Sequence, residues 1–171
     1  MAELKKAVVD ASPLVFLAKL NHLSLLTHLY EEITIPETVY IEAVEQGLFY
    51  GYPDASLIAA FVRKLGEGSI LKPSSWLKGL KEASLGKGEK ETIALAYELG
   101  AEAIIDDSRA RKIARKYGVR TRGTLGVLTR AYRLNLISRE TLAELLNVIQ
   151  LREDIWIRPE LCEEVRRKVL L

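Results

Sequence analysis

The stretch 101-AEAIIDDSRARKIARKYG-118 decides the fold, because it passes from a short apolar run through two acids into a basic amphipathic segment. We predict a strand over 101–106 that ends at Asp106 and Asp107, followed by a helix that Gly118 closes. A buried strand that leads directly into a helix is typical of the crossover units of a parallel sheet. Two adjacent carboxylates repel each other, so a helix cap, the neighbouring arginines or a bound cation must compensate them.

The same alternation recurs along the chain. Short apolar runs predict further strands at 7–10, 33–36, 69–73 and 119–123. Apolar residues at helical spacing predict helices at 12–20, 23–30, 36–47, 55–66, 89–100, 125–135, 138–150 and 159–170. We expect Ser12 and Asp54 to cap two of these helices, a loop over 47–53, and a loop with one helical turn over 74–88.

These elements predict an α/β fold, a three-layer α/β/α sandwich around a central, mostly parallel, Rossmann-like sheet. With 171 residues, we expect one domain over 1–171. Its core would span about 7–134, and the helices of 135–171 would pack on that core or on a dimer partner.

Composition excludes several classes of protein. The chain is 49% apolar and carries a net charge of only +2, so it can bury a full core and has no general polyanion-binding tail. Cys162 is the only cysteine, which rules out an intrachain disulfide and favours a reducing compartment. No apolar run is long enough to cross a membrane, and the first residues do not resemble a signal peptide. We therefore expect a cytoplasmic protein without membrane partners.

Acidic residues gather at one predicted edge of the sheet. Asp10 ends the strand 7–10, while Asp106 and Asp107 end the strand 101–106. Since sites in parallel sheets form beyond the carboxyl ends of the strands, these acids should lie together. Glu42 and Glu89 can reach the same edge from helices.

Convergent carboxylates need either raised pKa values or cations to neutralise them. Oxygen ligands suit Mg²⁺ or Mn²⁺, whereas zinc would require histidine or cysteine. Such a cluster aligns water and a phosphodiester for in-line attack. Basic and polar side chains beside it would hold neighbouring phosphates, and the candidates are Ser12, Arg109, Arg111, Lys112 and Thr124.

Five segments together resemble the PIN-domain family, especially a prokaryotic branch of predicted nucleic-acid-binding proteins. They are "VVDASPLVFLAK", the acid in "IPETVYIEAV", "GEKETIALAYELGA", "AIIDDSRARKIA" and "GTLGVL". The resemblance implies an α/β/α sandwich and a metal-dependent ribonuclease that uses Mg²⁺ or Mn²⁺. It also implies a homodimer, and for the toxin-type members a protein antitoxin as partner.

The resemblance assigns a role to each acid. Asp10 corresponds to the first acid of the family, Glu42 to the second and Glu89 to the third, where the family more often has aspartate. Asp106 and Asp107 cover the fourth acid, and Ser12 corresponds to the small hydroxyl residue that follows the first.

Several alternatives stay open at this point. One member of the Asp106–Asp107 pair would ligate metal, while the other caps a helix or supports the ligands from behind. We expect Glu91 to be a surface residue, with a place beside Glu89 in the site as the alternative. The basic helix after Asp107 is equally well a solvated face or a phosphate-binding one. Trp156 is expected in the core or a dimer interface, with base stacking as the alternative.

We therefore expect an endoribonuclease that hydrolyses RNA through a metal cluster, with a toxin-type role. The alternative is a nucleic-acid- or partner-binding module with a degenerate, non-catalytic site. A phosphatase that uses Asp10 as nucleophile is a third reading, but Ser12 stands where that chemistry needs a second acid.

Overall fold

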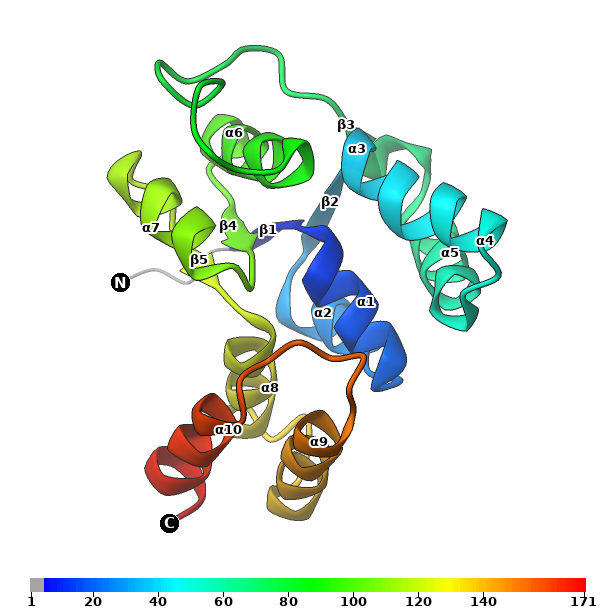
Figure 1. Ribbon diagram of the computed structural model, residues 1–171, viewed down its shortest axis with the longest axis vertical. Coiled ribbons are helices and arrows are strands. Elements are labelled where there is room, and N and C mark those ends of the chain that lie inside the picture. The colour runs from blue at the N-terminus through cyan, green and yellow to red at the C-terminus, as the bar shows by residue number, and fades with distance from the viewer. Residues whose placement is uncertain (1–4) are drawn as a thin grey trace.

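A computed structural model describes residues 5–171. Within this part of the chain, parallel strands form a single sheet in the order β3-β2-β1-β4-β5 (Figure 1). Its strands are β1 (Lys6–Val9), β2 (Glu32–Pro36), β3 (Ile70–Leu71), β4 (Glu102–Ile104) and β5 (Thr121–Arg122). The predicted α/β fold with a parallel sheet is confirmed.

Helices connect and follow the strands. They are α1 (Ala11–Lys19), α2 (Ser24–Leu29), α3 (Glu37–Tyr40), α4 (Gly47–Phe49), α5 (Pro53–Leu65), α6 (Lys87–Leu99), α7 (Ser108–Lys116), α8 (Thr124–Arg133), α9 (Arg139–Leu151) and α10 (Pro159–Val165). A π-helical stretch, Ile41–Gln46, joins α3 to α4, and another, Arg166–Leu170, extends α10. A single 3₁₀ turn, Glu67–Ser69, precedes β3.

The central strands bury side chains on both faces, which accounts for their continuous apolar sequence. Ala7 and Val9 of β1 face a core shared with α1, α2, α5, α8, α9 and α10. Val8, between them, faces a second core built with α6 and α7. These two cores are the interfaces between the three layers of the sandwich.

Three local expectations were wrong. The segment Gly47–Phe49 is helical rather than a loop. A Cβ at Gly47 would lie 2.7 Å from Ala55 Cβ, so this glycine serves the close packing of α4 on α5. Ser12 and Asp54 do not cap helices, because Asp10 and Tyr52 occupy the N-cap positions.

The sheet has a topological switch point between β1 and β4. The chain runs from β1 to β2 and β3 on one side, then crosses to β4 and β5 on the other. At this junction Val9 pairs with Ile104, and the Asp10 N–H donates to the Ile104 carbonyl at 3.0 Å. Crevices beyond the carboxyl ends of two such strands are the usual place for a site.

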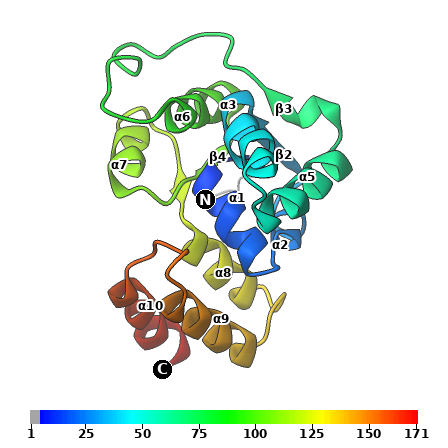
Figure 2. The same cartoon turned by 45° about the vertical axis from the view of Figure 1, so that its right-hand side comes forward.

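The C-terminal helices α8, α9 and α10 stack beneath this junction at one end of the molecule (Figure 2). Among residues 5–171, no helix combines the length and apolar composition needed to cross a membrane.

Candidate active site

Asp10 lies at the end of β1 and is 6% exposed. It holds the N-cap position of α1, yet its carboxylate does not form the side-chain cap bond that this position usually supplies. The adjacent Ala11 N–H forms a hydrogen bond with this buried carboxylate, which can still interact with other groups at the switch point.

The structure distinguishes the two adjacent aspartates. Asp107 Oδ1 accepts from the backbone N–H of Ala110 at 2.8 Å and so caps α7. Asp106 instead turns to α8, where Thr124 donates its N–H to Oδ1 and its hydroxyl to Oδ2, both at 2.7 Å. Asp106 thus has a fixed orientation at the sheet edge, while Asp107 holds the start of a helix.

A glycine brings Glu42 and Asp10 to the same place. A Cβ added at Gly88, in the first turn of α6, would lie 3.4 Å from Glu42 Oε2 and 3.6 Å from Asp10 Oδ1. The same Cβ would be 3.2 Å from Val39 Cγ2. Both carboxylates therefore approach the backbone of α6 at a residue without a side chain.

Glu89 and Glu91 have different surroundings. Glu89 lines the adjoining cleft, and its Oε2 accepts from the Gly86 N–H at 2.9 Å, which makes it part of the α6 capping box. Glu91 is only 5% exposed, and its Oε2 accepts from the Thr38 N–H at the start of α3, at 3.2 Å. Glu91 is therefore buried behind the cluster, and our preferred reading of it as a surface residue was wrong.

The acids perturb one another electrostatically. Burial is the main reason that the pKa of Asp10 rises from 3.8 to about 7, and the hydrogen bond from Ala11 opposes this rise. Repulsion from Glu89, Glu42 and Asp106 raises the same pKa further. The raised pKa of Asp10 thus reflects both its burial and the closeness of the three other acids.

Two further pKa shifts follow the same logic. Partial burial, then repulsion from Glu89 and Glu91, raises the pKa of Glu42. Burial also raises the pKa of Asp106, although the two bonds from Thr124 and the positive charge of Arg111 oppose it. The anionic form of Asp106, which is half-buried, thus has two hydrogen bonds and a nearby positive charge to stabilise it.

The donor chemistry fits a hard divalent cation, since the polar groups that gather here are carboxylates. In the positions that the side chains take in residues 5–171, no three acidic, histidine or cysteine side chains converge tightly enough to hold one ion. The bond from Gly86 draws the Glu89 carboxylate toward the helix start. A metal bound beside Asp10 would therefore use the other oxygen of Glu89 or replace this bond.

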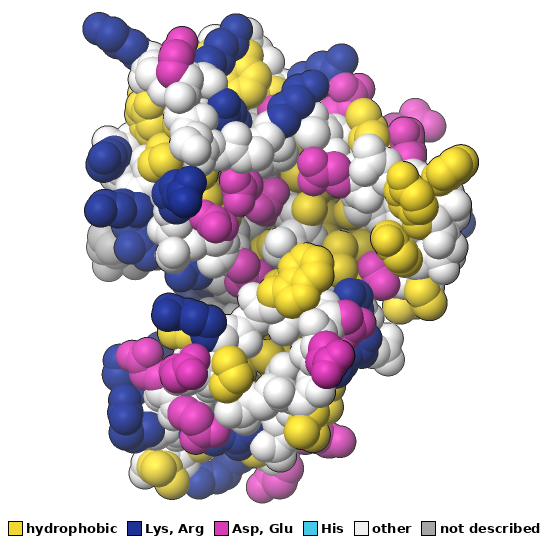
Figure 3. Space-filling model, in the orientation of Figure 1, with side chains coloured by type: hydrophobic (Ala, Val, Ile, Leu, Met, Phe, Trp, Pro, Cys, Tyr) yellow, Lys and Arg dark blue, Asp and Glu magenta, His cyan; other side chains and the backbone are white. Residues whose placement is uncertain are grey.

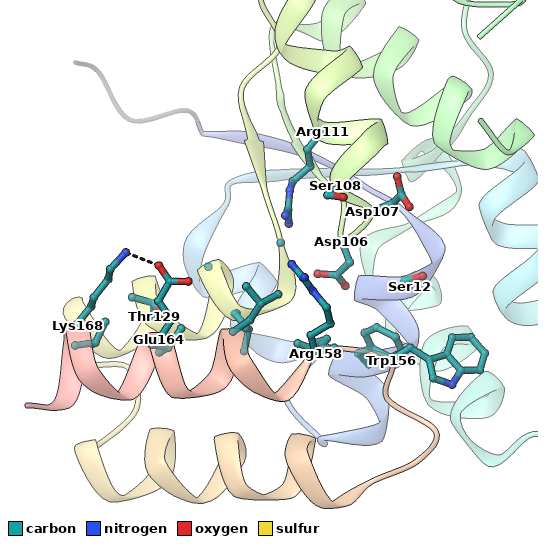
Figure 4. A pocket seen from close by; sticks show the side chains of 18 of the residues that line it. Ser12, Asp106, Asp107, Ser108, Arg111, Thr129, Trp156, Arg158, Glu164 and Lys168 are labelled. Atoms are coloured by element: carbon teal, nitrogen blue, oxygen red, sulfur yellow. Dashed lines mark hydrogen bonds and ion pairs between the residues drawn. The ribbon is translucent and has the colours of Figure 1, made fainter. Parts of the chain in front are cut away.

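A cleft of about 700 Å³ opens beside this cluster, between the sheet edge and the C-terminal helix α10 (Figure 4). Ser12, Glu89 and Asp106 line one side of it. Arg158 and Lys168 belong to the other. Figure 3 shows acidic side chains gathered near the middle of this face, with Lys and Arg side chains along one flank.

The residues predicted to bind nucleic acid divide into three groups. Ser12 and Arg111 line the cleft, and Arg111 Nη1 donates to the Ile105 carbonyl at 3.4 Å. Arg109 lines a neighbouring groove with Asp107 and donates to the Ser84 carbonyl at 3.3 Å. Lys112 is exposed and lines neither, whereas Thr124 is fully buried beneath Asp106.

Sequence reasoning missed the contribution of the C-terminal segment. Arg158, Glu164 and Lys168 come from or next to α10 and form the outer wall of the cleft, together with Arg133 at the end of α8. The only sequence signal was the basic residue in "IWIRPE", which follows a tryptophan. Gly123 ends the predicted strand 119–123, and a Cβ there would lie 2.9 Å from Asp106 Oδ1.

Comparison with known proteins agrees with this geometry. A family model described as a PIN domain matches residues 6–170, almost the whole chain. A comparison with curated protein sequences found no significant match.

Proposed function

We propose, because the chain belongs to the PIN-domain family, that it hydrolyses RNA phosphodiester bonds at the Asp10 cluster with a divalent cation. One observation carries the proposal. Asp10, nine-tenths buried at the switch point, has a pKa near 7 because burial and three other acids disfavour its charge. A cation bound there would remove this penalty, and hydrolysis of phosphodiesters is a common use of such a cation.

Each acid has a role in the proposed site. Asp10 and Asp106 would hold Mg²⁺ or Mn²⁺, with Glu42 and Glu89 completing the cluster or orienting water. When bound, the metal would supply a water of lowered pKa and stabilise charge on the leaving oxygen. Attack by water leaves no covalent intermediate on the chain.

The remaining groups position substrate or ligands. Thr124 fixes the direction of the Asp106 carboxylate, and Asp107 anchors the first turn of α7. Arg111 and Arg158 stand in the same cleft, where guanidinium groups can hold phosphates on either side of the scissile bond.

Manganese-dependent cleavage of labelled single-stranded RNA tests the proposal. Asp10→Asn should reduce the rate on the order of a hundredfold or more while the fold stays intact by circular dichroism. Asp107→Ser is the matched control, since serine also caps helices and the rate should change little. Equal rates for wild type and Asp10→Asn would end the assignment.

A non-catalytic binding module is the second candidate. The engagement of Glu89 by Gly86 favours it, because one oxygen of the third acid already accepts a backbone hydrogen bond and is not free to ligate a metal. Calorimetry with Mn²⁺ separates the two functions. A catalytic site should bind the metal and lose it in Asp10→Asn, whereas the binding module should retain RNA affinity without metal.

The toxin-type role, the antitoxin partner and the homodimer remain predictions. A toxin should arrest growth when the wild-type chain is expressed and should not do so as Asp10→Asn. Light scattering on the purified chain measures whether it forms a dimer.

A further inference from the structure

We infer that Trp156 stacks on one base of a single-stranded RNA and thereby selects single strands for the site. The inference rests on the proposed function, because it assigns a subsite to the substrate of that reaction. The first observation is that the indole of Trp156 is exposed to solvent. Trp156 is 82% exposed, although the sequence favoured burial in a core or an interface.

The backbone around Trp156 is anchored, so its exposure is imposed by the fold. Ile155, immediately before it, is 3% exposed and belongs to the main core. The Ile157 N–H donates to the Ile155 carbonyl at 3.0 Å, which closes a tight turn around the tryptophan. Because Ile155 is buried and the turn from Ile155 to Ile157 is closed by a hydrogen bond, the backbone directs the indole away from the core.

A polar clamp fixes the start of the same loop. Asp154 Oδ1 accepts from Arg152 Nε at 2.7 Å, and the Lys19 ammonium donates to the Asp154 carbonyl at 2.9 Å. Arg152 Nη1 also donates to the Lys19 carbonyl at 3.2 Å, at the end of α1. The loop that carries Trp156 is therefore tied to α1, the helix that follows Asp10.

The indole already makes one edge-to-face aromatic contact. Its ring meets that of Phe16 at 86° with 6.5 Å between centroids, and Phe16 is buried in the core of α1. An edge-to-face contact orients the ring, and the high exposure of Trp156 shows that most of its surface remains open to a second partner. A nucleobase is a flat partner of suitable size for such a surface.

The position of the indole connects it to the acidic cluster. Trp156 and Phe16 line the same cleft as Ser12 and Asp106. In Figure 4, Arg111 and Arg158 extend toward Asp106 from opposite sides, and Trp156 lies beyond Ser12. A strand with a phosphate between the arginines could therefore place a neighbouring base over the indole.

Duplex RNA cannot use this platform without disruption, because its bases are already stacked and paired. Unpaired bases are free to turn out and stack on aromatic side chains. Combining one stacking surface with nearby guanidinium groups is the usual chemistry of single-strand binding. This combination separates the inference from a protein-binding role for the exposed indole, which would not require the arginines.

Fluorescence provides the test, since the chain has only one other tryptophan, Trp76. In Trp76→Phe the emission reports on Trp156 alone, and EDTA prevents turnover. A short single-stranded oligoadenylate should quench this emission saturably. Anisotropy of a labelled oligonucleotide should give a Kd about tenfold weaker in Trp156→Ala and a smaller loss in Trp156→Phe.

Phe49→Ala is the matched control, because Phe49 is 83% exposed and does not line the cleft. Its affinity should equal that of the wild type, and the same oligonucleotide in a duplex should bind without dependence on Trp156. Unchanged affinity in Trp156→Ala overturns the inference. So does loss of self-association in that variant at unchanged affinity, which would assign the indole to a protein interface.

Binding without metal keeps the two proposals apart. If the chain binds RNA through Trp156 but never cleaves it, the stacking site is supported and the proposed nuclease activity is contradicted. Manganese-dependent cleavage with the same KM in wild type and Trp156→Ala would keep the nuclease and remove the stacking site.

Discussion

Thr124 holds both oxygens of the Asp106 carboxylate, one through its backbone N–H and the other through its hydroxyl, each at 2.7 Å. The threonine begins α8 and the aspartate follows β4, so this pair joins the sheet edge to the first of the C-terminal helices. It lowers the pKa of Asp106 against the effect of burial.

Replacing Thr124 with valine tests this relationship. Thr124→Val keeps the shape and the backbone donor but removes the hydroxyl, so the pKa of Asp106 should rise. If ionised Asp106 is required, the acidic limb of the pH–rate profile should move upward by about one pH unit. Thr124→Ser restores the hydroxyl and should restore the profile. Coincident profiles for all three proteins would mean that the bond does not tune the site.

The raised pKa of Asp10 predicts an unusual pH dependence of stability. Without metal, the folded chain holds this proton up to about pH 7, whereas the unfolded chain releases it near the ordinary aspartate pKa of 3.8. The free energy of unfolding should therefore fall as the pH rises from about 4 to 7, by a contribution on the order of 4 kcal/mol. Urea titrations in EDTA across this range measure the fall.

Two comparisons assign that fall to Asp10. Asp10→Asn should flatten the dependence, since asparagine does not titrate. Adding Mn²⁺ at pH 7.5 should stabilise the wild type by mass action and leave Asp10→Asn almost unchanged. A stability that rises with pH in EDTA would contradict the burial of an uncompensated carboxylate.

The sequence predicted the sheet edge well because its signals are local. The acids directly follow β-branched or apolar strands, and parallel strands bring their carboxyl ends to one edge, so Asp10 and Asp106 could be placed together. The division of labour between Asp106 and Asp107 could not be predicted. It depends on the two bonds from Thr124, which the sequence analysis placed beside the cluster as a phosphate ligand and not as the partner of Asp106.

Other features depended on contacts between distant segments. Glu91 has the sequence surroundings of a solvated helix residue, but the start of α3 packs over it and uses its carboxylate as an acceptor. Trp156 is a large apolar residue of the kind usually found in a core, yet Ile155 is the buried residue here and the indole is exposed to solvent. The spacing of apolar residues in the sequence does not show which of two adjacent apolar residues is buried in the folded chain.

The close surroundings of Gly123 allow a steric test of the site. A Cβ there would lie 2.7 Å from Arg111 Nη1 and 2.9 Å from Asp106 Oδ1, so Gly123→Ala must displace both groups. The cleavage rate should fall on the order of tenfold, with a loss of stability of about 1–3 kcal/mol from the crowding. Gly68→Ala is the control, because a Cβ at Gly68 meets open space. Equal rates for both variants would show that the Asp106 position tolerates displacement.

Glu102 predicts the opposite pattern, a large effect on stability with little effect on the site. This carboxylate begins β4, at the end of the sheet away from Asp106, and is 2% exposed. It accepts from the Tyr30 hydroxyl at 2.5 Å and forms ion pairs with Arg122 at 3.2 Å and Arg130 at 3.8 Å.

Glu102→Leu leaves buried guanidinium charge without its carboxylate and should lower the free energy of unfolding by about 3–5 kcal/mol. Tyr30→Phe removes one donor and should cost about 1.5–3 kcal/mol. Chemical denaturation measures both, and the cleavage rate per folded molecule should match the wild type. A lower rate at full folding would instead connect this network to the acidic edge through β4.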